Sequence, residues 1–141
     1  MKTRESGMPD EPLWETFFDP EAILDALGLR DLSADVLDVG CGYGTFTLPV
    51  ARRTRGTVWA LDIEDTLIEA LQVRADAAVP GKVRALRRDV LTEGSGLPDG
   101  TCEAVLFFNI LHAEDPLRLL AEARRVLAPG GRVAAIHWVY D

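Results

Sequence analysis

The sequence is poor in cysteine, in positive charge and in long apolar runs, and each shortage argues against a class of protein. Only two cysteines, Cys41 and Cys102, occur in 141 residues. They provide neither a disulfide framework nor the spacing of a metal site, so no metal is expected. Acidic residues outnumber basic ones by 23 to 15, which gives a net charge of −8. That balance disfavours nucleic acid as a partner, because a grip on phosphates needs clustered cations.

Membrane and secretory segments are also lacking. No apolar run approaches the roughly 20 residues that span a bilayer. Residues 1–10 carry two early cations without an apolar core, which is unlike a secretory signal. We therefore expect a cytoplasmic protein with no membrane partner and with a flexible N-terminus over residues 1–12. The arginines near 52–55 and 84–88 are interpreted as solvated helix and strand ends.

Strand-like and helix-like runs alternate along the rest of the chain. An N-terminal helical segment (13–34) contains a helix that we expect to be capped by Asp19 and ended by Gly28. The strands are predicted at 34–40, 56–63, 82–90, 104–112 and 132–140. The helices are predicted from about 45, at 64–78 with Val73 or Ala75 on the inner side, and from 115 to Pro-Gly-Gly at 129–131, whereas 91–103 reads as a loop. This alternation predicts a single α/β domain with a core at 35–141, a Rossmann-like doubly wound parallel sheet with helices on both faces. The third strand is half-polar and hence outer, and the fourth is fully apolar and hence central.

A glycine-rich stretch follows the first of these strands. "VLDVGCGYG" at 36–44 has a glycine at every second position from Gly40, which suggests close approach of a ligand to the backbone. A dinucleotide fingerprint, G-x-G-x-x-G, would need glycine where Thr45 or Thr47 stands. A nicotinamide-dependent oxidoreductase is therefore disfavoured. The pattern is instead an acid, Asp38, followed by G-x-G-x-G.

"VLDVGCGYGTFT" resembles the first motif of the class I S-adenosylmethionine-dependent methyltransferases. Four further elements are similar to that family in the same order: Asp62 in "WALDIED", Asp89 in "RRDVL", the stretch "VLFFNILHAEDP" and the stretch "RVLAPGGRVAAI". The resemblance runs from about residue 36 to residue 140. It implies a sheet with strand order 3-2-1-4-5 and S-adenosyl-L-methionine as the cofactor.

The resemblance also implies the cofactor site. The cofactor's ammonium would meet Asp38 and the Gly40 carbonyl, and its carboxylate would meet loop N–H groups and the start of the next helix. Asp62 would hold the ribose hydroxyls, Ile63 would pack on the adenine, and Asp89 would read the adenine amino group. The full set of expected cofactor-binding residues is Asp38, Gly40, Cys41, Gly42, Tyr43, Gly44, Asp62, Ile63, Asp89, Val90 and Asn109. Two alternatives stay open: Asp38 as a structural acceptor for loop amides, and Asp89 as a turn acid or helix cap.

The implied reaction is direct in-line methyl transfer, which leaves S-adenosyl-L-homocysteine as the product. Asn109 and His112 are the candidate catalytic residues at the exit of the fourth strand, with a helix cap as the alternative role of His112. Nucleobase amino-methyltransferases have an Asx-Pro-Pro-aromatic motif where this chain has "NILH" at 109–112, so a small-molecule acceptor is favoured. The segment "LWETFF" at 13–18 is interpreted as a lid or as packing for the first helix.

The resemblance fails after the fifth strand. The family's sheet has seven strands, and the two last have no counterpart here. A truncated form, pairing of the exposed strand edge with a second copy in a homodimer, and a minimal natural variant are the three explanations. A cofactor-binding but inactive module that serves as a partner or regulator is the alternative function.

Overall fold

A five-stranded parallel sheet organises the computed structural model, which describes residues 19–108 and 115–136. The strands are β1 (Asp35–Val39), β2 (Val58–Asp62), β3 (Val83–Arg87), β4 (Cys102–Phe108) and β5 (Leu127–Ile136). Their order in the sheet is β3-β2-β1-β4-β5, and every neighbouring pair is parallel. The predicted fold class and strand order are thus confirmed, with the third strand at an edge and the fourth in the interior.

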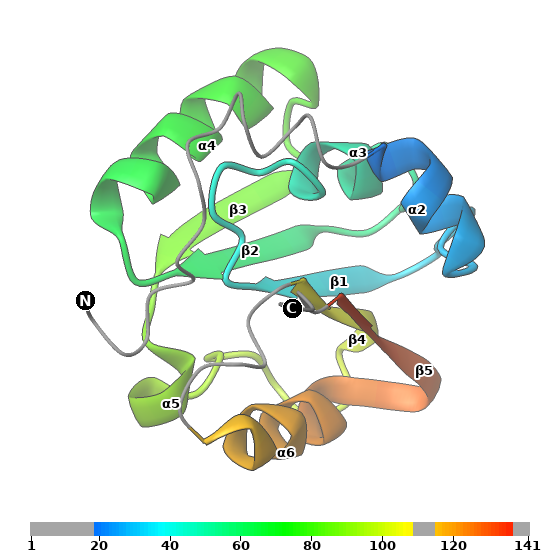
Figure 1. Ribbon diagram of the computed structural model, residues 1–141, viewed down its shortest axis with the longest axis vertical. Helices are drawn as coiled ribbons and strands as arrows, with labels where there is room; N and C mark the ends of the chain where they lie inside the picture. Colours follow the sequence, from blue (N-terminus) through cyan, green and yellow to red (C-terminus); the bar gives the residue numbers. More distant parts are fainter. Residues whose placement is uncertain (1–18, 109–114, 137–141) are drawn as a thin grey trace, which may run out of the picture.

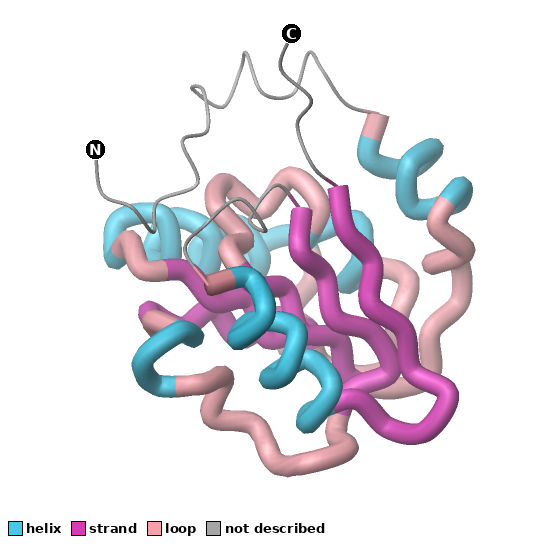
Figure 2. Tube along the Cα trace, turned by 60° about the horizontal axis from the view of Figure 1, so that its bottom comes forward, coloured by secondary structure: helices cyan, strands magenta, loops and turns pink. Residues whose placement is uncertain are grey.

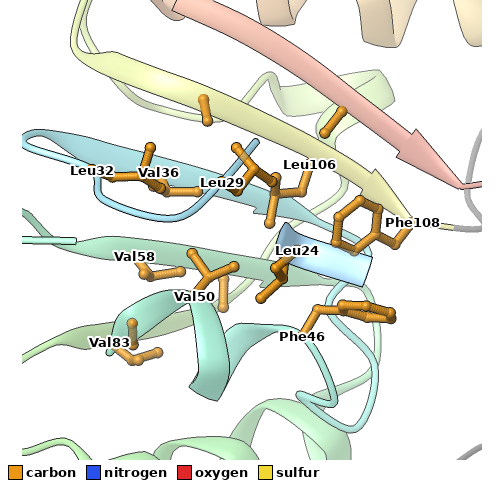
Figure 3. Packing of buried hydrophobic residues seen from close by; sticks show 14 of the residues in the cluster. Leu24, Leu29, Leu32, Val36, Phe46, Val50, Val58, Val83, Leu106 and Phe108 are labelled. Carbon is orange, nitrogen blue, oxygen red and sulfur yellow. The ribbon is translucent and has the colours of Figure 1, made fainter. Parts of the chain in front are cut away.

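Helices cover both faces of the sheet (Figure 1). One face carries α2 (Pro20–Ala26), α3 (Thr47–Ala51) and α4 (Asp65–Ala78), and the other carries α5 (Val90–Glu93) and α6 (Pro116–Val126). Each face has its own apolar core, because a parallel sheet buries both surfaces. Figure 3 shows the first core, where Leu24 and Val50 pack onto the strands beside Val58.

The helix boundaries follow the capping residues in the sequence. The side chain of Asp19 accepts a hydrogen bond from Ala22 N at the start of α2, and that of Asp115 does the same for α6. At the end of α2, the Leu29 amide donates to the Leu24 carbonyl at 2.9 Å. This closure needs Gly28 at φ +77°, a conformation that glycine adopts without strain. The predicted caps and the predicted end of α2 are confirmed.

Three local predictions were wrong or incomplete. The short helix α5 begins at Val90, the predicted last residue of the third strand, and continues into the stretch predicted as a loop. The helix expected from residue 45 begins at Thr47 and has only five residues. Pro-Gly-Gly at 129–131 does not separate helix from strand, because β5 already begins at Leu127 and pairs with Cys102, after which the register shifts. In α4, Ala75 is the buried residue of the two candidates, while Val73 is 71% exposed.

Arg53 is not the solvated helix end that the sequence suggested. Its side chain is only 14% exposed and ties α2 to the segment after α3. The guanidinium donates to Asp25 Oδ1 at 2.8 Å, to Glu21 Oε1 at 2.6 Å and to the Leu29 carbonyl at 3.0 Å. A charged residue therefore fixes the first described helix to the body of the domain.

Several predictions fall outside the described residues. These are the N-terminus (1–12), the aromatic segment at 13–18, and the ends predicted for the fourth and fifth strands at 109–112 and 137–140. Figure 2 shows the described strands side by side with helices on both sides. In this described part, none of the helices combines the length and the apolar character needed to cross a membrane.

Candidate functional site

The loop that follows β1 lies at the carboxyl ends of β1 and β2. The amides of Gly40 and Cys41 both donate to the Leu61 carbonyl, at 2.8 and 3.1 Å. The three loop glycines, Gly40, Gly42 and Gly44, have φ of +73°, +56° and +85°. Side chains disfavour that region, so the alternating glycines are required by the backbone itself.

The third glycine has a packing reason as well. A Cβ added at Gly44 would lie 2.4 Å from Leu71 Cδ1, so the loop sits directly against α4. Arg74 of α4 also donates to the Tyr43 carbonyl at 2.9 Å. The sequence suggested a ligand as the cause of the glycines, whereas at this position the neighbouring helix is sufficient cause.

Asp38, near the end of β1, is a buried carboxyl group with 3% exposure. It accepts a hydrogen bond of 2.6 Å from the hydroxyl of Thr47. Burial raises the pKa of Asp38 to about 6; the Thr47 hydrogen bond opposes this rise, and the charge of Asp62 adds to it. Sequence reasoning missed Thr47, because the hydroxyl lies on the next helix and its partner, Asp38, comes nine residues earlier in the chain.

Asp62 ends β2 and binds the glycine loop. Its Oδ2 accepts from the Gly42 amide at 2.9 Å, and its Oδ1 accepts from the Glu64 amide at 3.1 Å. A carboxylate oxygen can accept more than one hydrogen bond, and these two amides fix the orientation of the Asp62 carboxylate at the end of the strand. Asp62 thus joins the loop to the second strand, a structural task that adds to the ribose role expected from the sequence. Ile63 follows it, and the Ile63 carbonyl accepts from Arg87 Nε at 3.3 Å.

Asp89 lies just after β3, beside the end of β2. The two strand ends are joined there, since the Arg88 amide donates to the Asp62 carbonyl at 2.8 Å. The Asp89 side chain caps α5 by accepting from the Leu91 amide at 3.2 Å, and Val90 is the first residue of that helix. The helix-cap alternative is therefore realised, while an adenine contact by Asp89 stays a prediction.

Cys41 sits in the same loop with a half-buried thiol. Burial, together with the charges of Asp38 and Asp62, raises its pKa well above the ordinary value. The thiol is therefore neutral, which fits a small loop filler and not a nucleophile. Asn109 and His112, the candidate catalytic residues, lie outside the described residues. The part of β4 that leads to them ends at Phe108, whose ring meets that of Phe46 edge-on at 4.5 Å.

The structure thus brings together two carboxylates and a positive-φ glycine loop at the carboxyl ends of neighbouring parallel strands. This is the place where open α/β sheets bind nucleotide-like ligands. One further group suits a ligand there: the Thr45 hydroxyl is buried and has no hydrogen-bond partner among the described residues. The fold and this edge define a nucleoside-binding α/β domain.

The comparison with protein families is specific. Residues 36–131, more than half of the chain, match the family described as "Methyltransferase domain". The chain therefore belongs to the methyltransferase-domain family, within the class I S-adenosylmethionine-dependent methyltransferases. This membership implies S-adenosylmethionine as the cofactor, and the acidic groups around the loop suit its ammonium and sulfonium cations.

Curated relatives agree with that assignment. An uncharacterized methyltransferase of Mycobacterium tuberculosis is 33% identical over 131 residues, which cover 92% of this chain and 62% of that protein. A second one from the same organism is 35% identical over 132 residues, or 94% of this chain and 47% of that protein. The chain spans between a third and two-thirds of the length of the curated relatives that it matches.

Solved structures share the fold. A SAM dependent methyltransferase from Aquifex aeolicus superposes with a TM-score of 0.78 at 26% identity, over 98% of this chain and 73% of that one. The [4+2]-cyclase SpnF superposes with a TM-score of 0.69, also at 26% identity, over 80% of this chain and 43% of that one. The same fold thus carries more than one chemistry, so the reaction has to be argued from the site.

Proposed function

We propose that this chain holds the cofactor and supports methyl transfer to a small organic acceptor. The observation that carries the proposal is the pair of carboxylates, Asp38 and Asp62, on either side of the glycine loop. Two acids at adjoining strand ends attract a cationic adenosyl ligand, and a loop fixed to β2 and α4 is ready to receive it without reordering. The methyltransferase-domain membership supports the same conclusion.

Each of the three acids is proposed to bind a different part of the cofactor. Asp62, at the end of β2, would accept from the ribose hydroxyls, and Asp89, at the end of β3, would accept from the adenine amino group. Asp38 would hold the ammonium, since a cation next to a buried carboxyl group favours its charged form. Bound S-adenosylmethionine supplies an activated methyl group, which a nucleophile displaces in line to leave S-adenosylhomocysteine.

The chain's own contribution to the reaction would be alignment. Holding two reactants in line and away from water removes much of the entropic part of the barrier. Asn109 and His112 are proposed to face the acceptor, and a general base is needed only if the acceptor must lose its proton before attack. The acidic net charge of −8 favours a small neutral or cationic acceptor over a nucleic acid.

Calorimetric titration with S-adenosylhomocysteine and with a nicotinamide nucleotide tests the cofactor. We expect binding of the first ligand only. Asp62→Asn should weaken it by about 1–3 kcal/mol through lost hydrogen bonds to the ribose. Asp65→Asn is the matched control, because Asp65 is an exposed acid at the start of α4. Equal affinities of Asp62→Asn and Asp65→Asn would remove the ribose assignment.

Methyl transfer itself needs a second measurement. The protein is incubated with S-adenosylmethionine carrying a labelled methyl group and with a metabolite extract, and the labelled products are separated. Label in a small molecule supports the proposal. Tight cofactor binding without any labelled product would instead support the inactive-module alternative.

A further inference from the structure

The hydroxyl of Thr45 is exceptional among the buried polar groups. Its Oγ1 is the one buried side-chain nitrogen or oxygen, in the described ranges 19–108 and 115–136, that has no hydrogen-bond partner. Buried polar atoms in native proteins are almost always satisfied, because an unmade hydrogen bond costs about 1–3 kcal/mol. An exception of this kind needs a physical reason.

Comparable hydroxyls elsewhere in the domain are all satisfied. Thr47 donates to Asp38 at 2.6 Å, Thr54 donates to the Ala34 carbonyl at 2.6 Å, and Ser95 donates to Glu122 at 2.7 Å. These three residues are buried, and each lies where strands or helices pack. Thr45 differs from them in its place, directly after the last glycine of the candidate cofactor loop.

A loosely placed loop does not account for the missing partner. The backbone on the N-terminal side of Thr45 is held at Gly42 by Asp62, at Tyr43 by Arg74 and at Gly44 by the Cys41 carbonyl. The hydroxyl also does not cap the following helix, because α3 begins without a side-chain cap. The loop is fixed, and the hydroxyl within it has no structural task.

The proposed cofactor has a group that needs such a donor. Its carboxylate would come close to Asp38 and Asp62, whose ionised side chains accept hydrogen bonds and repel a negative charge. From the sequence, we expect the start of the next helix to help bind the cofactor's carboxylate. The dipole of that helix is weak, since α3 has only five residues. A neutral hydroxyl that can donate is therefore valuable at this position.

We propose that Thr45 is a cofactor-binding residue whose hydroxyl donates a hydrogen bond to the carboxylate at the amino-acid end of S-adenosylmethionine. This inference rests on the proposed function. Thr45 as a whole is only half-buried, although its Oγ1 is buried. A 120° rotation about χ1 carries Oγ1 to another staggered position on Cβ, and in the proposed complex this rotation brings the hydroxyl to the ligand.

Two ligands separate this role from a general effect on the loop. S-adenosylhomocysteine has the carboxylate, whereas 5′-methylthioadenosine keeps the adenosyl thioether and lacks the amino-acid end. Thr45→Val removes the hydroxyl at nearly constant volume. We expect it to weaken S-adenosylhomocysteine binding about 10-fold or more and to leave 5′-methylthioadenosine binding unchanged. Thr45→Ser should restore the affinity.

Stability provides a readout without ligand. Because Thr45→Val removes an unsatisfied hydroxyl, the melting temperature of the ligand-free protein should rise or stay level. Thr101→Val is the matched control for loss of a hydroxyl far from the loop; it gives up a hydrogen bond to the Pro98 carbonyl and should not change either affinity.

Three results would overturn the assignment. They are unchanged affinity of Thr45→Val for S-adenosylhomocysteine, an equal loss for both ligands, and a lower melting temperature without ligand. A wild-type protein that binds neither nucleoside would refute the proposed function itself, which is a distinguishable failure.

Discussion

Among single residues, Asp38 combines an electrostatic cost of burial with a central place in the site. It is buried, it accepts a hydrogen bond from the Thr47 hydroxyl, and its pKa of about 6 lies above the ordinary value of 3.8. A raised pKa means that the folded state holds the proton more tightly than the unfolded state does. The ionised form therefore destabilises the fold at neutral pH, unless a cation is bound next to it.

This leads to a prediction for Asp38→Asn without ligand. The wild-type protein should lose about 2–3 kcal/mol of stability relative to the variant between pH 4 and pH 7.5, because the contribution of Asp38 is present below pH 3.8 and lost as the pH rises through about 6. Urea denaturation of both proteins at both pH values measures the difference, and titrating groups that do not interact with Asp38 cancel. Parallel pH dependences would contradict the prediction.

How far the site was predictable varies from residue to residue. The family resemblance placed the acids at 38, 62 and 89 at strand ends and the glycines in a turn, and the structure has them there; their contacts with the cofactor stay a prediction. The roles of Thr45 and Thr47 could not be predicted, because the sequence does not show whether a threonine hydroxyl has a hydrogen-bond partner in the fold. Arg74 was missed for a similar reason: its partner, the Tyr43 carbonyl, is a backbone atom 31 residues away.

Among the elements, the glycine loop and α4 form one packed unit. The loop's third glycine leaves no room for a side chain next to Leu71, so a side chain at this position would have to displace the Leu71 side chain. The contact places the glycine pattern under two constraints at once, backbone conformation and packing.

A matched pair of substitutions separates these constraints. Gly44 and Gly81 have similar φ, +85° and +75°, but a Cβ at Gly81 would meet nothing within 4 Å. Gly81→Ala should cost about 1–2 kcal/mol from backbone strain alone. Gly44→Ala should cost about 1–3 kcal/mol more, because the methyl group displaces Leu71. Thermal unfolding measures both, and equal costs would show that the packing is unimportant.

Sequence rules predicted the boundaries of elements that have local signals, and they failed where pairing with a neighbouring strand sets the boundary. The capping acids Asp19 and Asp115 fixed two helix starts correctly. The start of β5 was wrong, because Pro-Gly-Gly usually marks a turn, whereas here the extended chain is held by pairing of Leu127 with Cys102 on β4. A helix as short as α5 falls below what periodicity can detect.

In the whole molecule, the strand order was predictable because alternation and family resemblance allow few arrangements of five parallel strands. What lies beside the outer edge of β5 could not be predicted, because no local sequence signal indicates which segment covers an edge strand. Among the described residues, no strand pairs with the outer edge of β5, and Val133 on that strand is 43% exposed. The homodimer at this edge stays a prediction.

Light scattering after size-exclusion chromatography tests that prediction. The wild-type protein should be a dimer, and Val133→Lys should be a monomer, because a charge on an edge strand opposes pairing. Leu117→Lys is the control, since Leu117 is an exposed apolar residue on α6 and not on the edge strand. A wild-type monomer at all concentrations would contradict the dimer.

The central position of β1 bears on how the protein is made. Of the described strands it is the first to be synthesised, yet it is flanked by β2 and by β4, and β4 begins only at Cys102. One side of β1 therefore stays without its strand partner until β4 (Cys102–Phe108) has been synthesised, and this pairing is non-local. Because the glycine loop follows β1 directly, nucleoside affinity should arise only after β4 has been synthesised.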